Sequence, residues 1–157
     1  MLAMNSSTSN AVLRAARADD LSGIEQLLTT SGLPLAGVAA GLGGFVVAES
    51  AGAIVGTAAL EICQSDALLR SVAVAPEWRS RGLGRALVTR VIADAEAQGL
   101  RAMYLLTTTA EHYFPSFGFQ PVTRAAVPAE VQSTVEFREA CPASAVVMCR
   151  QCTTSET

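Results

Sequence analysis

The sequence predicts an α/β protein built on a mixed central sheet of about seven strands. Short apolar runs rich in Val, Ala and Leu recur along the chain, and amphipathic stretches at helical spacing separate them. Half of the 157 residues are hydrophobic, and the length fits one domain, since domains run to roughly 100–200 residues. The expected order of elements is β-α-β-β-β-α-β-α-β-β.

The first elements are a strand over residues 12–15 and a helix that starts near Asp19 and Asp20. The two aspartates stand where a helix start favours an acceptor side chain and a negative charge. Leucine and isoleucine then recur every three or four residues, until the Gly-Leu-Pro sequence at Gly32 stops the helix. Residues 35–44 are rich in Gly and Ala and predict a loop that contains a short helix.

Three strands joined by tight turns come next, followed by the longest helix. Strands over residues 45–48 and 53–62 flank a Glu-Ser-Ala-Gly turn, and a second turn leads to residues 67–74. From Leu83 onwards apolar residues recur at every fourth position, and Gly99 ends this amphipathic helix. The remaining predicted elements are a strand at 102–106, a short helix at 110–117, and strands at 119–122 and 143–149.

The composition excludes several classes of function. All 11 basic residues are arginine, so the chain has no lysine for a P-loop or a Schiff base. His112 is the single histidine and no G-x-S-x-G sequence is present, which argues against a histidine-rich zinc site or a serine-hydrolase elbow. We therefore expect no metal. A net charge of −3 without a basic run also argues against a nucleic-acid partner.

Residues 26–48 carry no charge and are long enough to consider as a membrane span, which needs about 20 residues. Five glycines and Pro34 within this stretch favour a loop and a strand start instead, so we expect no membrane partner. Residues 1–10 have neither the basic nor the apolar region of a signal peptide. A cytoplasmic location with four reduced cysteines is the resulting expectation.

The most informative motif is the Arg-Ser-Arg-Gly-Leu-Gly sequence from Arg79 to Gly84, which follows a strand and opens the long helix. Glycines allow close approach of the backbone, and a helix N-terminus offers amide donors and the positive end of a dipole, so the motif predicts a pyrophosphate site. A glycine-rich turn that only starts a helix is the alternative. The dinucleotide-binding fingerprint is not met, because it requires a third glycine near Leu87.

In this context residues 74–87 resemble motif A of the Gcn5-related N-acetyltransferases (GNAT), whose pattern is Arg/Gln-x-x-Gly-x-Gly/Ala. Residues 110–119 resemble the later helix of the same family, which usually ends in Gly-Phe. The resemblance covers residues 11–150. It implies one GNAT domain there, with helices on both faces of the sheet. Residues 1–10 and 152–157 are polar and small, so we expect flexible termini there.

The resemblance also implies that acetyl-CoA is the co-substrate. In that family the backbone of motif A holds the pyrophosphate, and the backbone of a bulged fourth strand pairs with the pantetheine arm. The pantetheine positions correspond to Val72 and Val74. The pyrophosphate positions correspond to Arg79, Arg81, Gly82, Gly84 and Arg85.

A narrower resemblance concerns residues 69–74, 105–110 and 137–145, which are similar to N-acetylglutamate-synthase-like enzymes and to small acetyltransferases found with arsenic-resistance genes. This similarity implies that the acceptor is the amine of a small molecule, an amino acid or a glutamate-like toxic analogue. The amine would attack the thioester directly. Relatives often form dimers, so a homodimer is possible.

Two catalytic positions of the family are not met. The general-acid tyrosine of many relatives corresponds to Phe114, and the glutamate of some relatives corresponds to Leu68. Tyr113 is one residue away from the first of these, so it is the candidate acid, with a packing aromatic as the alternative. Glu61 on the neighbouring strand is the candidate base, although strand carboxylates are most often solvated.

Candidate residues for the acceptor are Arg70, Thr107 and Thr108. Arg70 interrupts an apolar strand, where its fork suits a substrate carboxylate or a structural pair with Glu61. The threonines lie at the end of a buried strand, where ligands sit in open α/β sheets, or they cap the next helix, as Thr109 is expected to do.

Two other functions stay open at this point. One is acetylation of protein or peptide N-termini. The other is a non-catalytic module that binds CoA or a metalloid. Cys149 and Cys152 form a lone C-x-x-C pair, and Cys141 would supply a third thiol for a metalloid.

Overall fold

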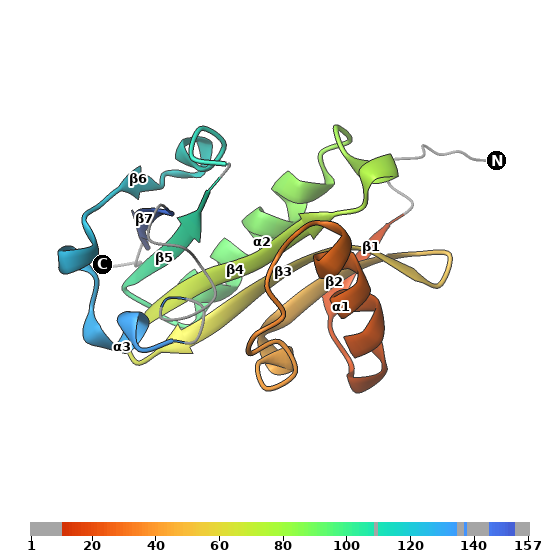
Figure 1. The fold of residues 1–157 in the computed structure, drawn as a ribbon, viewed down its shortest axis with the longest axis horizontal. Helices are drawn as coiled ribbons and strands as arrows, with labels where there is room; N and C mark the ends of the chain where they lie inside the picture. The colour runs from red at the N-terminus through yellow and green to blue at the C-terminus, as the bar shows by residue number, and fades with distance from the viewer. Residues whose placement is uncertain (1–10, 109, 135–136, 138–144, 153–157) are drawn as a thin grey trace. The chain divides into compact units, whose positions relative to one another are not determined.

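The computed structural model describes residues 11–108, 110–134, 137 and 145–152. Seven strands form one sheet in the order β1-β2-β3-β4-β5-β7-β6 (Figure 1). The β4–β5 pairing is parallel, whereas the β1–β2, β2–β3, β5–β7 and β6–β7 pairings are antiparallel. The mixed seven-stranded sheet predicted from the sequence is therefore confirmed.

The strands follow the predicted order, and α1 and α2 lie at their predicted places. The strands are β1 (Val12–Ala15), β2 (Phe45–Ser50), β3 (Ala53–Cys63), β4 (Asp66–Val74), β5 (Ala102–Thr107), β6 (Gln120–Pro121) and β7 (Val146–Gln151); the α-helices are α1 (Leu21–Thr30), α2 (Leu83–Ala97) and α3 (Ala129–Gln132).

Some local predictions were wrong. The helix expected at 110–117 is a turn followed by a 3-10 helix over Phe114–Phe117, which ends where Gly118 adopts a left-handed φ of 91°. Only Leu42–Gly44 is helical within the 35–44 loop, again as a 3-10 turn. The four-residue helix α3 was not predicted, because it is too short to show helical periodicity.

The chain divides into two compact units, and the division passes through β3, β4 and α2. One unit comprises Met1–Ala59 and Ser71–Val91, and the other comprises Leu60–Arg70 and Ile92–Thr157. Each unit is described separately below. The expectation of a single domain over residues 11–150 stays a prediction.

In the first unit, helices pack against opposite faces of β3. A bulge makes this possible, because one step along β2, from Ala48 to Glu49, corresponds to two steps along β3, from Gly56 to Ile54. Ile54 therefore faces α1, which lies in front of β2 and β3 in Figure 1. A Cβ added to Gly23 of α1 would lie 3.1 Å from Ile54 Cγ1. Gly56 faces α2, where a Cβ would lie only 2.8 Å from Leu87 Cδ1.

The second unit has its own apolar core, which several elements share. Leu68 from β4, Tyr104 from β5 and Val147 from β7 pack with Val131 of α3. Beside this core, the buried Asp66 carboxylate accepts a 2.7 Å hydrogen bond from Arg101 Nη2, which ties the start of β4 to the residue before β5. Across the described residues, no helix is long and apolar enough to cross a membrane.

Candidate functional site

The loop after β4 combines a 3-10 turn with two residues of left-handed backbone. Pro76–Trp78 forms the 3-10 turn, and Ser80 and Gly82 follow with φ of 67° and 83°. Arg79 Nε donates a 3.1 Å hydrogen bond back to the carbonyl of Val74, which closes the loop onto the end of β4. Such alternation of right- and left-handed residues directs successive amides toward one side and is typical of anion sites.

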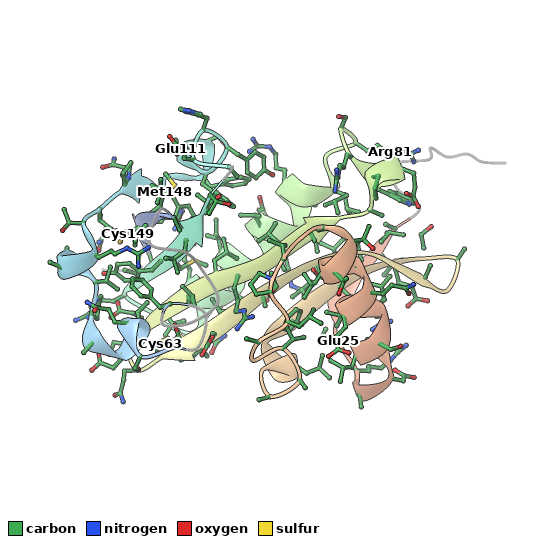
Figure 2. All side chains as sticks on the ribbon, viewed as in Figure 1. Glu25, Cys63, Arg81, Glu111, Met148 and Cys149 are labelled. Atoms are coloured by element: carbon green, nitrogen blue, oxygen red, sulfur yellow. The ribbon has the colours of Figure 1, made fainter. Side chains whose placement is uncertain are left out.

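The N-terminus of α2 begins directly after this loop. The Ala86 amide makes a helical bond to Gly82 O at 3.0 Å, which marks the first turn of α2. Amides at a helix N-terminus are donors that an anion can bind. No acidic residue lies in that turn. The Arg81 guanidinium stacks over the Trp78 ring at 4.9 Å, and Figure 2 shows Arg81 on the loop that leads into α2. The loop and helix end are together suited to hold an anion.

The strand that leads into this loop is irregular at Ser71. Its φ is 58°, although serine disfavours this region, and only 8% of the residue is exposed. The Thr57 hydroxyl on β3 donates a 2.8 Å hydrogen bond to Ser71 O. Val72 and Val74 follow, and both are partly exposed. The seven cofactor residues predicted from the sequence all belong to the first unit, at the irregular part of β4, the loop and the start of α2.

The residues predicted for catalysis and for the acceptor belong to the second unit. Arg70 Nη1 lies 3.7 Å from Glu61 Oε1; the Arg70 side chain is 4% exposed and that of Glu61 is 39% exposed. The two candidates therefore form the ion pair that the sequence offered as an alternative. The distance of 3.7 Å between Arg70 Nη1 and Glu61 Oε1 is longer than a good charge-assisted hydrogen bond.

The threonines at the end of β5 have different environments. Thr107 Oγ1 accepts a 2.9 Å hydrogen bond from the Ala110 amide, so Thr107 caps the turn that follows β5. Thr108 is exposed. Thr109, the residue expected to cap this turn, lies outside the described residues, as does Cys141.

Tyr113 stands just before the 3-10 helix and is 38% exposed. Its ring makes edge contacts with Phe114 at 5.2 Å and with Phe117 at 5.3 Å between centroids. The ring therefore contributes to an aromatic cluster, and its partial exposure also leaves it accessible to a ligand. The neighbouring Phe114 is buried, so it acts as a core residue.

Sequence reasoning missed a clamp on this segment. Arg150 of β7 donates from Nε to Phe117 O at 2.7 Å and from Nη1 to Glu96 Oε2 at 2.8 Å, so it joins the 3-10 turn to the end of α2. A side chain at Gly118 would lie 3.4 Å from Arg150 Nε. The Gly-Phe signature of the sequence indicated the turn but contained nothing that pointed to its partner on β7.

The described cysteines are free thiols, of which Cys63 and Cys152 are buried and Cys149 is partly exposed. Burial raises the pKa of Cys63 to about 11 and also raises the pKa values of Cys149 and Cys152 above their ordinary range. Cys63 comes from the end of β3 and Cys149 from β7 (Figure 2). Within the part of the chain that the structure describes, no group of three or more His, Cys, Asp or Glu side chains is arranged to hold a metal ion.

A groove of about 570 Å³ runs beside α1 in the first unit, and a charge network lines it. Arg14 on β1 donates to both oxygens of Asp20 at 2.7 and 3.0 Å and to Glu49 at 2.9 Å. The Arg17 amide donates to Asp20 as well, at 2.7 Å. Because these charges satisfy one another, the network stabilises the fold and none of the predicted site residues takes part in it.

Comparison with known proteins decides the family. The family model described as "Acetyltransferase (GNAT) domain" matches residues 41–121, which is just over half of the chain. The chain belongs to the GNAT acetyltransferase family. The matched region of this GNAT domain runs from β2 to β6 and includes the irregular β4, the loop and all of α2.

The similar curated proteins are named amino-acid acetyltransferases. The protein from Pseudomonas fluorescens (strain Pf0-1) is 40% identical over 96 residues, which cover 60% of this chain and 22% of that protein. The protein from Azotobacter vinelandii is 43% identical over 82 residues, which cover 51% of this chain and 19% of that protein. The matched region thus spans about a fifth of the length of these relatives.

Solved structures share the fold of this GNAT domain over most of its length. N-acetylglutamate synthase from Neisseria gonorrhoeae, complexed with coenzyme A and N-acetyl-glutamate, has a TM-score of 0.79 at 21% identity, covering 91% of this chain and 35% of that one. Rv2747 from Mycobacterium tuberculosis, in a complex that contains CoA, has a TM-score of 0.73 at 26% identity, covering 89% and 98%. The ribosomal-protein-S18-alanine N-acetyltransferase from Escherichia coli reaches 0.72 at 22% identity, covering 93% and 96%.

Proposed function

We propose that this GNAT domain is an acetyl-CoA-dependent N-acetyltransferase whose acceptor is the amine of an amino acid or of a glutamate-like toxic analogue. The observation that carries the proposal is the backbone of the Arg79–Arg85 segment, where left-handed Ser80 and Gly82 lead into a helix N-terminus without acidic residues. This arrangement suits a pyrophosphate. The similarity of up to 43% identity to amino-acid acetyltransferases supports the choice of acceptor.

In the proposed complex, amides of the Arg81–Arg85 segment bind the pyrophosphate of acetyl-CoA. Arg79, Arg81 and Arg85 are exposed around it and contribute positive charge. The backbone of Val72 and Val74 pairs with the pantetheine arm. This division of roles needs no lysine, which agrees with a chain whose basic residues are all arginine.

The reaction is a direct attack of the neutral amine nitrogen on the thioester carbonyl. A nitrogen–carbon bond forms, the carbon–sulfur bond breaks, and the amine loses a proton while the CoA sulfur leaves as a thiolate. Glu61 is the proposed proton acceptor, because its side chain is 39% exposed and so remains in exchange with water. Tyr113 is the proposed donor to the thiolate, and the Val74 amide is the proposed stabiliser of the tetrahedral oxyanion.

The acceptor's carboxylate is assigned to Arg70, with Thr107 and Thr108 as further contacts. An arginine fork gives a carboxylate two parallel hydrogen bonds, and Arg70 is the buried arginine nearest to the proposed base Glu61. When the carboxylate engages Arg70, Glu61 is released to accept the proton of the amine.

The proposal also covers the setting in the cell. A cytoplasmic enzyme fits the reduced cysteines, and the resemblance to acetyltransferases found with arsenic-resistance genes points to detoxification of an amine. A homodimer is proposed because relatives in this family often form dimers. We expect no nucleic-acid or membrane partner.

Thiol release from acetyl-CoA tests the proposal directly. The assay should include single amino acids, glutamate analogues and a short peptide with a free N-terminal alanine. We expect turnover with at least one free amino acid or analogue, and mass spectrometry should show one added acetyl group on its amine. Turnover with the peptide alone would favour protein N-terminal acetylation, and no turnover with any amine would remove the enzyme proposal.

A metalloid-binding module is the remaining alternative, and a separate experiment tests it. Titration with arsenite should give no tight binding, because Cys63 and Cys152 are buried and the pKa values of all three described thiols, Cys149 included, are raised. Tight arsenite binding that is lost in Cys149→Ser, together with no acetyl transfer, would replace the proposal.

A further inference from the structure

A buried threonine on β3 holds the irregular backbone of β4. Thr57 is fully buried, and its hydroxyl donates a 2.8 Å hydrogen bond to the carbonyl oxygen of Ser71, which has a φ of 58°. We propose that Thr57 is a positioning residue that sets the direction in which β4 presents its backbone to acetyl-CoA. This inference rests on the proposed function, since it concerns the residues that pair with the pantetheine arm.

The peptide geometry connects Thr57 to Val72. The described chain contains no cis peptide bond, so the unit that joins Ser71 to Val72 is trans. In a trans unit the carbonyl and the N–H point in opposite directions. Because Ser71 O points at the Thr57 hydroxyl, the Val72 N–H points away from that hydroxyl. In the proposed role, this direction leaves the Val72 N–H as a donor for the pantetheine arm.

The hydrogen bond opposes a return of Ser71 to ordinary strand geometry. A positive φ costs serine free energy, because its Cβ crowds the following carbonyl. If Ser71 relaxed to a negative φ, its carbonyl would turn away from Thr57 and leave a fully buried hydroxyl without this partner. Losing a partner inside the protein costs more than losing one in water. Thr57 therefore keeps β4 irregular even when no ligand is bound.

Packing alone does not account for a threonine at this position. Thr57 pairs in register with Val47 of β2, and Ala58 and Gly56 flank it on β3. Valine has nearly the shape of threonine and is equally favourable in strands. The hydroxyl is the feature that distinguishes the two residues, and it donates to Ser71 O.

Calorimetric titration with coenzyme A on the full chain tests this role. Thr57→Val should weaken coenzyme A binding by about tenfold, the loss expected for one buried hydrogen bond that orients a ligand contact. Thr57→Ser keeps the hydroxyl and should bind like the wild type. Thr89→Val makes the same chemical change at an exposed position on α2 and is the matched control. Kinetically, Thr57→Val should raise the acetyl-CoA KM and leave the acceptor KM unchanged.

A glycine background separates positioning from packing. Glycine adopts a positive φ without the cost that serine bears. In a Ser71→Gly chain the Thr57→Val change should therefore weaken coenzyme A binding clearly less than in the wild type. An equal loss in both backgrounds would mean that Thr57 acts through packing, which would overturn the proposal.

The other outcomes are also decisive. Wild-type affinity in a folded Thr57→Val variant would overturn the positioning role while leaving the proposed function intact. If Thr57→Val does not fold, Thr57→Cys takes its place, because a thiol is a weaker donor: intermediate affinity supports the role and wild-type affinity overturns it. Failure of the wild type itself to bind coenzyme A would instead contradict the proposed function.

Discussion

Three residues of the candidate site hold positive φ angles, and two of them are not glycine. Ser71, Ser80 and Gly82 have φ of 58°, 67° and 83°. A non-glycine residue in this region costs roughly 1–2 kcal/mol of conformational free energy. Two such residues near one loop therefore indicate that the surrounding structure fixes the backbone, as it often does at functional sites. The sequence revealed Gly82, because glycine marks such positions. It could not reveal the serines, since the fold imposes their conformation.

Arg70 shows how a residue's role depends on its neighbour. The sequence left open a substrate carboxylate or Glu61 as its partner, and the structure contains the Glu61 pair at 3.7 Å. We predict that Arg70→Ala raises the acceptor KM at least about tenfold, because a charge-assisted contact contributes about 1.5–3 kcal/mol. Acetyl-CoA affinity should be unchanged.

Steady-state kinetics with each substrate varied in turn measures both effects of the Arg70 change. Arg17→Ala removes an exposed arginine and is the control. A raised acetyl-CoA KM with an unchanged acceptor KM would show that Arg70 has been assigned to the wrong substrate.

Among the elements, α2 and β3 approach each other closely because Gly56 has no side chain. A Cβ there would lie 2.8 Å from Leu87 Cδ1 and 3.3 Å from Leu83 Cδ2. This contact sets the depth at which the first turns of α2 lie on the sheet. The periodicity of the helix predicted its apolar face, but the bulge that turns Gly56 toward that face follows from strand register and left no signal in the sequence.

In the segment after β5, by contrast, the sequence predicted an element that the structure does not contain. The similarity of residues 110–119 to a family helix predicted an α-helix, whereas only Phe114–Phe117 is helical and it is a 3-10 turn. Pro115 cannot donate its amide, and Arg150 binds Phe117 O from outside the segment. A long-range contact thus decided a local structure, which a local pattern cannot predict.

The start of the first helix contains a carboxylate that should control acid stability. Hydrogen bonds from Arg14, assisted by the Arg17 amide, lower the pKa of Asp20 to about 2. An unfolded aspartate titrates near ~4, so the contribution of Asp20 to stability is complete above about pH 5 and is lost as the pH falls through the folded pKa of about 2. We predict that the wild type exceeds Asp20→Asn in free energy of unfolding by about 1–2 kcal/mol at about pH 6, and that most of this difference is lost at about pH 2.

Urea unfolding of both proteins between about pH 6 and about pH 2 measures this difference. Asp19→Asn is the control on the same turn, because the Asp19 side chain is 82% exposed and lies 3.7 Å from Arg17. A difference between wild type and Asp20→Asn that stays constant over the whole pH range would contradict the assignment.

For the whole molecule, the sequence was sufficient for the order of the strands, for the two longer helices and for the family. Apolar runs, turn residues and the Arg79–Gly84 motif are local features, and the seven-stranded sheet followed from them. The division of the chain into two compact units was not foreseen, because it depends on long-range contacts. The sequence motif predicted the site residues that are proposed to act through their backbone. Thr57 and Arg150 instead bind residues far away in the sequence, Ser71 and Phe117, so only the structure revealed them.

The central claim is that the Arg79–Arg85 segment holds the pyrophosphate of acetyl-CoA, and coenzyme A titration of a Gly82→Asp variant tests it most directly. Gly52→Asp is the matched control, because Gly52 and Gly82 have φ of 82° and 83° and a Cβ added to either would meet no atom within 4 Å. A carboxylate beside the pyrophosphate costs several kcal/mol, so Gly82→Asp should lose about a hundredfold or more in affinity while Gly52→Asp binds like the wild type. Equal coenzyme A affinity in Gly82→Asp and the wild type would contradict the account.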